Sequence, residues 1–176
     1  FAQQNARLAG FELEIDIHPH PLDWLHFENT FSYVRGRFAE AVEGNRNIPF
    51  IPAAHLVSEL RADILKKEKS IRNISLRIQL DNTFRQGQIF DVYNTETETP
   101  GYALLNTGFS ADIYSRKKNV ATIFFNIMNI GDVAYQQHLS RLKYTAENIA
   151  TGRTGVYNMG RNFNFKLLIP LSVNLK

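Results

Sequence analysis

The chain of 176 residues contains no cysteine, which excludes disulfide bonds and thiolate metal ligands. It also has no stretch of about 18 consecutive apolar residues, so no membrane-spanning helix is predicted. Lys and Arg number 20 against 17 acidic residues, a net charge of +3, and no basic run is dense enough to form a nucleic-acid surface. We therefore expect no nucleic-acid partner.

The motifs of the common enzyme classes are missing as well. The sequence has no Gly-x-Ser-x-Gly, no phosphate-binding glycine loop, no dinucleotide fingerprint and no His-Glu-x-x-His. We expect no catalytic residue, no enzyme activity, no metal site and no cofactor. The first residues, FAQQNARLAG, contain no initiator Met, basic start or apolar secretion segment, so we expect a processed chain or part of a longer protein.

What the sequence does contain is a long alternation of apolar and polar residues, clearest at residues 74–85, ISLRIQLDNTFR. Successive side chains of a strand point to opposite faces, so this pattern predicts a strand with one apolar and one polar face. A tilted strand needs about 9 to 11 residues to cross a bilayer. Soluble strands average about 5 to 6 residues. The length therefore favours a membrane strand.

Similar alternation recurs along the chain and predicts seven strands. The connections between them alternate between short, charged turns and long polar loops. An up-and-down barrel across an outer membrane has tight turns at one rim and extended loops at the other, so we predict an all-β, antiparallel, up-and-down transmembrane barrel fold. The predicted strands are residues 10–17, 24–37, 55–65, 74–85, 102–114, 121–129 and 156–169. The long loops are 38–52, 86–101 and 131–154, and the short turns carry Lys66, Lys67, Arg116, Lys117 and Lys118.

Three segments resemble the C-terminal part of TonB-dependent outer-membrane receptors. Residues 126–135, NIMNIGDVAY, resemble the Asn-Leu-Phe-Asp-x-x-Tyr signature of that family, although Gly131 stands where Phe is expected. Residues 159–163, MGRNF, resemble the Pro-Gly-Arg-x-Phe start of its last strand, and residues 48–55 resemble its proline-marked entry to a late strand. The Asn-rich composition resembles receptors of the Bacteroidetes type. The matching motif residues are Asn129, Asp132, Tyr135, Gly160 and Arg161.

This resemblance implies that residues 1–176 are the C-terminal portion of a 22-strand barrel whose plug domain and earlier strands are absent. Such receptors lie in the outer membrane of Gram-negative bacteria. They take up a metal chelate, haem, cobalamin or a glycan with energy relayed by TonB. The implied partners are outer-membrane lipid, the TonB system through the absent plug, and the imported small ligand.

Candidate site residues follow from the long loops and from the polar faces of the strands. For ligand binding we select Tyr93, Tyr135, His138, Arg141 and Tyr144, with loop packing as the alternative. For the lumen wall we select Glu12, Glu14, Asp16, Arg77, Gln79, Asp81 and Arg85. Aromatic residues near strand ends predict a girdle at the lipid headgroups: Trp24, Tyr33, Tyr102, Tyr114 and Tyr157.

Two alternatives remain open from the sequence. His18 and His20 have the spacing of metal ligands but lie in a proline-rich turn, where solvated side chains are the simpler interpretation. Alternation alone does not say which face is inside, so a soluble β-barrel or β-sandwich that binds a ligand is the second predicted function.

Overall fold

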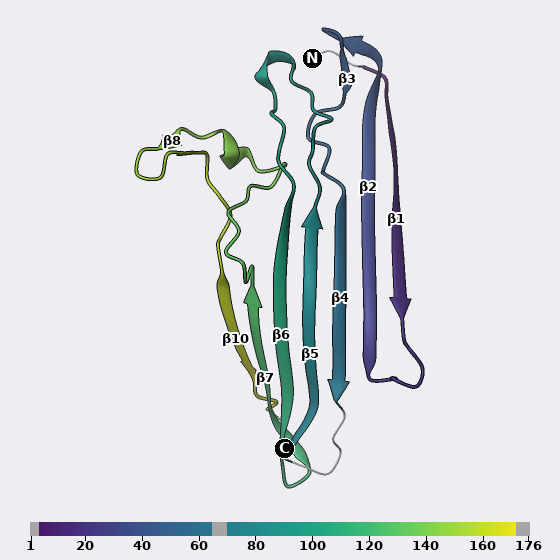
Figure 1. The fold of residues 1–176 in the computed structure, drawn as a ribbon, viewed down its shortest axis with the longest axis vertical. Helices are drawn as coiled ribbons and strands as arrows, with labels where there is room; N and C mark the ends of the chain where they lie inside the picture. Colours follow the sequence, from purple (N-terminus) through teal and green to yellow (C-terminus); the bar gives the residue numbers. More distant parts are fainter. Residues whose placement is uncertain (1–3, 65–69, 172–176) are drawn as a thin grey trace, which may run out of the picture.

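The computed structural model describes residues 4–64 and 70–171, and they form one large antiparallel sheet (Figure 1). The long strands lie side by side in chain order, as an up-and-down topology requires. They are β1 (Ala6–Ile17), β2 (Leu25–Val42), β4 (His55–Ile64), β5 (Ile71–Thr83), β6 (Tyr102–Ser115), β7 (Lys118–Met128) and β10 (Asn162–Leu168). The short β3 (Asn45–Asn47) pairs with β2, while β8 (Glu147–Asn148) and β9 (Arg153–Thr154) form a separate hairpin. The prediction of an all-β antiparallel fold is confirmed.

The sheet is open within the described residues, because the edge strands β1 and β10 do not pair with each other. Two short 3₁₀ turns, Val92–Asn94 and Arg141–Tyr144, lie in the long connections. Over the described part of the chain, no helix is long and apolar enough to cross a membrane.

One face of the sheet is apolar and uncovered. The register places Leu13 opposite Phe31 and Leu60 opposite Ile78, so apolar side chains form rows across the strands. Large members of this face stay exposed: Leu13 at 50%, Ile78 at 56% and Phe165 at 65%. Only three hydrophobic residues in the described part are buried, namely Phe90, Leu104 and Ala111. The sheet therefore has no conventional hydrophobic core on its apolar side.

The connections sort by length, as the sequence predicts. The short ones lie at one end of the sheet and the long ones at the other (Figure 1). The β6–β7 turn uses Arg116 (φ 47°) and Lys117 (φ 64°), and two central residues with positive φ are what a two-residue hairpin of this kind needs. Lys118 is already the first residue of β7. Lys66 and Lys67 lie outside the described residues.

The first long connection is more regular than predicted. Residues 38–42 continue β2 to Val42, and the chain turns at Glu43 (φ 47°) and Gly44 (φ 83°) into β3. The prediction of an irregular segment from residue 38 is therefore wrong at its start. Backbone pairing with Ala6 and with β3 keeps this part extended although its sequence lacks apolar alternation.

The last strand is shorter than predicted. It begins at Asn162 instead of residue 156, because the backbone N–H groups of Val156 and Asn158 bond the carbonyls of Leu142 and Tyr135 in the same loop. Smaller shifts occur elsewhere: β1 begins at Ala6 instead of residue 10, and β5 spans Ile71–Thr83 instead of 74–85.

Candidate functional site

Polar side chains on the second face join four strands into a hydrogen-bonded network. Arg77 of β5 donates from Nη2 to Asn126 Oδ1 of β7 at 3.1 Å, and its Nη1 lies 3.7 Å from Glu59 Oε2 of β4. Gln79 donates to Glu59 at 3.2 Å and accepts from Asn106 of β6 at 3.1 Å. Such a network stiffens this face and gives partners to charges that would otherwise be costly to desolvate.

Gly108 of β6 lets Arg77 reach over its neighbouring strand. A Cβ atom at this position would lie 2.5 Å from Arg77 Nε and 2.7 Å from Asn126 Oδ1. A side chain here would thus displace the guanidinium group that connects β5 with β7.

Toward the short turns, the same face carries a second charged group. Arg61 Nη2 donates to Glu28 Oε1 at 2.9 Å, and its Nε lies 3.6 Å from Asp63 Oδ2. His26 Nε2 lies 3.3 Å from the same Asp63 oxygen. Every charge in this group has an opposite or titratable partner on an adjacent strand.

The two histidines of the proline turn, His18 and His20, differ in their contacts. His18 Nε2 lies 2.8 Å from Asp16 Oδ2, and its ring meets His26 edge-on with centroids 4.6 Å apart. His20 is exposed and lies 3.8 Å from Asp23. In the described ranges, no three His, Cys, Asp or Glu side chains are arranged to hold a metal ion.

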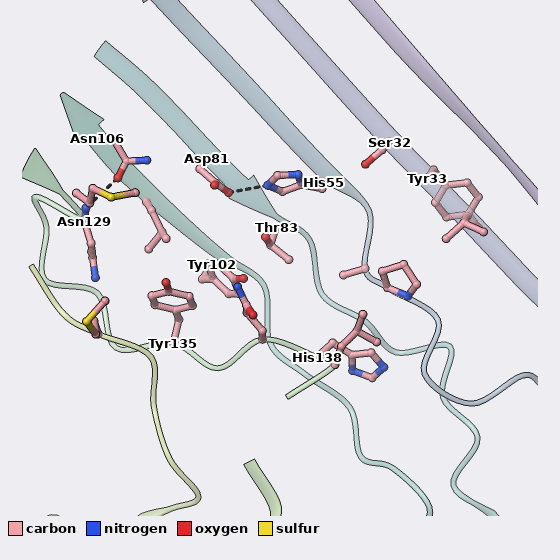
Figure 2. Close-up of a pocket in the computed structure, with 18 of the residues that line it drawn as sticks. Ser32, Tyr33, His55, Asp81, Thr83, Tyr102, Asn106, Asn129, Tyr135 and His138 are labelled. Carbon is pink, nitrogen blue, oxygen red and sulfur yellow. Dashed lines mark hydrogen bonds and ion pairs between the residues drawn. The ribbon is translucent and has the colours of Figure 1, made fainter. Parts of the chain in front are cut away.

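A cleft of about 990 Å³ opens where the polar face meets the long loops (Figure 2). All seven long strands contribute residues to its floor, and the β7–β10 connection supplies its far wall. Tyr102 and Tyr135 lie together in it with ring centroids 4.4 Å apart. Adjacent polar lining residues are Ser32, His55, Asp81, Thr83, Asn106 and Asn129.

The floor of the cleft contains a close His–Asp pair. His55 Nε2 lies 2.7 Å from Asp81 Oδ1, joining β4 to β5 (Figure 2). Ser32 is the register partner of His55 on β2, so three residue types of a nucleophilic triad share one face. Ser32 makes no hydrogen bond to His55 within the described part of the chain, so the required nucleophile–base contact is missing.

The buried carboxylate of Glu96 connects the three long loops. It is only 2% exposed. Oε1 accepts from the backbone N–H of Phe90 at 2.6 Å, within its own loop, and Oε2 accepts from that of Phe50 at 3.0 Å, in the loop after β2. His138, in the loop after β7, brings its Nε2 to 3.3 Å from Oε2. One acid therefore contacts all three long loops.

A chain of polar contacts continues from His138. Lys143 Nζ donates to Thr99 Oγ1 at 2.7 Å and to the Thr97 carbonyl at 2.8 Å. Thr99 Oγ1 lies 2.8 Å from His138 Nδ1, so the hydroxyl and the ring share a hydrogen bond. Burial lowers the pKa of His138; Glu96 opposes this shift and Lys143 adds to it. We refer to Glu96, Thr99, His138 and Lys143 as the loop cluster.

The predicted ligand-binding residues are distributed over three environments. Tyr135 and His138 line the cleft. Arg141 lies 4.6 Å from the ring centroid of Phe50, and the Tyr144 hydroxyl accepts from the Thr97 N–H at 3.2 Å, so both join loops. Tyr93 is 78% exposed in a 3₁₀ turn and does not line the cleft.

The predicted lumen residues lie on the polar face, with one exception. Arg85 lies beyond the end of β5 and forms an exposed ion pair with Glu98. Two of the others, Glu12 and Asp81, line the cleft. The residues that share the polar face are Glu12, Glu14, Asp16, Arg77, Gln79 and Asp81.

The motif residues connect the end of β7 to the start of β10. Asn129 is buried and exchanges two hydrogen bonds with the backbone of Val133, at 2.8 and 2.9 Å. Asp132 Oδ1 accepts from the Arg161 N–H at 2.8 Å, and Arg161 Nε donates to the Ile130 carbonyl at 2.8 Å. A Cβ at Gly160 would collide with the Asp132 carboxylate. These residues shape a connection, and only Tyr135, Asn129 and Gly160 border the cleft.

Several cleft residues were not selected from the sequence. The alternation along each strand places four of them on the polar face, and this was the only signal in the sequence that could have identified them. They are Ser32, His55, Thr83 and Asn106. The sequence-based prediction that Tyr102 lies in a lipid girdle is wrong, because Tyr102 points into the cleft against Tyr135 (Figure 2). Tyr157 is not in a strand at all, and Arg153 lies 5.1 Å from its ring centroid.

No family model and no curated protein matches the sequence. Among solved structures, the fold is similar to that of a protein described as copper transporter OprC, with a TM-score of 0.72 and 16% sequence identity. The match covers 93% of this chain and 24% of that protein. The chain thus spans about a quarter of the length of its structural neighbour, and the similarity establishes a shared fold over nearly all of this sheet.

Proposed function

We propose that this chain is part of the wall of an outer-membrane transport barrel, the C-terminal portion of a 22-strand, TonB-dependent receptor. The observation that supports this most directly is the difference in polarity between the two faces of the sheet. One is apolar and exposed, while the other carries charge pairs, amide ladders and the cleft. A membrane barrel places its apolar face against lipid and its polar face against the lumen.

The position of the loops supports the same orientation. Residues from the long connections, such as Tyr135 and His138, pack over the polar face and close the cleft there. A soluble sandwich would need a second layer packed against the apolar face, and no described segment covers that face, whose large side chains are exposed. The exposed row of Leu76, Phe109 and Phe125, which are in register on β5, β6 and β7, is instead suited to acyl chains.

In this proposal, the cleft contacts the cargo on its way through the lumen. The Tyr102–Tyr135 pair offers aromatic faces, and the adjacent polar side chains offer hydrogen bonds. The cargo classes are a metal chelate, haem, cobalamin or a glycan, and the neighbour's description adds copper. Both methionines of the chain, Met128 and Met159, also line the cleft, and thioethers suit Cu(I).

A matched pair of substitutions tests the membrane orientation. Leu80→Arg places a charge on the apolar face opposite Leu105, where it should cost about 1 to 4 kcal/mol, depending on its depth in the bilayer. Thr30→Arg puts the same side chain at a similar height on the polar face, beside Glu14 in the register, and should be tolerated. The measurement is the amount of heat-modifiable, folded protein in outer membranes. Equal loss in both variants, or loss only in Thr30→Arg, would favour the soluble module.

Transport is tested separately by cargo uptake in cells that carry the full-length protein. Tyr135→Ala should slow the uptake of the true cargo, measured by metal content or labelled ligand for each class. Tyr93→Ala is the control, because this exposed tyrosine lies outside the cleft. Unchanged uptake of every cargo class in Tyr135→Ala, with the barrel correctly assembled, would contradict a role of the cleft in transport.

A further inference from the structure

Three arginines gather on the outward face of β1 and β2, near the long-loop end. The register between these strands is continuous and pairs Arg7 with Arg37 and Ala9 with Arg35. Residues two apart in a strand share a face, so Arg35 and Arg37 lie on the same side as Arg7. The three guanidinium groups therefore occupy adjacent positions, and we call them the arginine triad.

The triad has no acidic partner in the sheet. Neither an ion pair nor a hydrogen bond joins its side chains to any residue in ranges 4–64 and 70–171. The Nε atom of Arg35 is buried and lacks an acceptor. Like charges directly opposite each other destabilise a sheet, so the Arg7–Arg37 pair is unfavourable unless an anion lies between them.

The triad lies directly beyond the apolar band. On the same face, Phe11, Phe31 and Tyr33 form an aromatic group. The ring centroid of Phe11 lies 5.6 Å from that of Phe31 and 6.1 Å from that of Tyr33. Arg35 follows Tyr33 on this face, and Arg7 lies four residues before Phe11, about 13 Å along the strand. Aromatic belts mark the level of the lipid headgroups, so the triad is at or just above that level.

We propose that the arginine triad binds the phosphate of an outer-leaflet lipid headgroup. This inference rests on the proposed function, because only an outer-membrane barrel with its long loops outside presents this face to that leaflet. Guanidinium groups match phosphate oxygens with paired, charge-assisted hydrogen bonds. A phosphate between Arg7 and Arg37 would remove their repulsion and give the buried Nε of Arg35 a nearby acceptor.

The test uses the full-length protein, purified from outer membranes and delipidated. Binding of purified lipid A is measured by native mass spectrometry, and dephosphorylated lipid A serves as the comparison ligand. We expect the double variant Arg7→Gln/Arg37→Gln to bind lipid A about tenfold or more weakly, since charge-assisted hydrogen bonds are lost. The matched control, Arg116→Gln/Lys117→Gln, removes two charges from the opposite rim and should bind as the unmodified protein does.

Each other outcome contradicts the proposal in a distinct way. Equal affinity of the double variant and the unmodified protein would show that the triad is only a solvated basic surface. Full competition by millimolar inorganic phosphate would assign the site to free phosphate instead of lipid. Heat-modifiable electrophoretic mobility, which reports whether the barrel has folded, distinguishes failure of the lipid site from failure of the proposed function. A folded barrel without the affinity difference overturns the lipid site alone, and a protein that forms no barrel overturns the proposed function as well.

Discussion

Glu96 is the residue whose charge most directly organises the long loops. Replacing it by Gln removes one of the two carboxylate oxygens that accept from Phe50 and Phe90. We expect Glu96→Gln to destabilise the loop cluster by about 1 to 3 kcal/mol, because a buried donor is left without an acceptor. Limited proteolysis of the long loops in the membrane-embedded protein measures this. Glu98→Gln removes an exposed partner of Arg85 and should leave the cleavage rate unchanged.

His138 makes the loop cluster sensitive to acid. Its folded pKa is lowered by burial, so the folded loops bind fewer protons than the unfolded ones. Their stability is then complete above the ordinary histidine pKa of about 6.5 and falls as the pH drops from there toward the lowered folded value. Glu96, which attracts a proton, and Lys143, which repels one, are the charged groups that face the ring.

We expect protease protection of the long loops to decrease between about pH 6.5 and pH 5, as histidine titrates. In His138→Gln this change should largely disappear. Tighter loops at acid pH would mean that attraction between Glu96 and a protonated His138 outweighs burial, and would contradict the expected loss of protection.

At the scale of single elements, Gly108 tests whether the polar network supports the sheet. Gly108→Ala should displace Arg77 from Asn126 and destabilise the protein by about 1 to 3 kcal/mol through overpacking. Gly131→Ala is a matched control, because its added Cβ would meet only Val133 Cγ2 at an ordinary 3.5 Å. Unfolding in detergent gives the comparison. If combining Gly108→Ala with Arg77→Ala costs the full sum of both changes, the two residues do not act through one contact.

The sequence predicted those elements in which water lies on one side and apolar groups on the other. Residues 11–17 of β1 and 74–81 of β5 alternate strictly for this reason, and the observed register places their apolar residues on the predicted faces. The extension of β2 to Val42 was missed because residues 38–42 do not alternate between apolar and polar side chains; backbone pairing alone holds them. The start of β10 was misplaced since the donors of Val156 and Asn158 bond within the loop.

The candidate site was harder to predict than the strands. Tyr135 and His138 were selected, yet their partners Tyr102 and Glu96 were not, because these contacts join segments separated by more than 30 residues. Parity within β6 would have placed Tyr102 on the polar side with Asn106, but its position near a strand end suggested a lipid girdle. Periodicity identifies the face of a side chain, and only the folded loops determine what it touches.

For the whole molecule, the two free edges carry the most direct prediction about its context. Edge strands present unpaired backbone groups, which lipid does not tolerate, so β1 and β10 must each pair with a further strand if the sheet spans a membrane. We therefore expect the amides of β1 and β10 in the full-length protein to resist hydrogen exchange as well as those of the central β5. In the 176-residue chain expressed alone, β1 and β10 should exchange much faster than β5. Rapid exchange of both edges in the full-length, membrane-embedded protein would mean that no neighbouring strands close the sheet, and the larger barrel would be wrong.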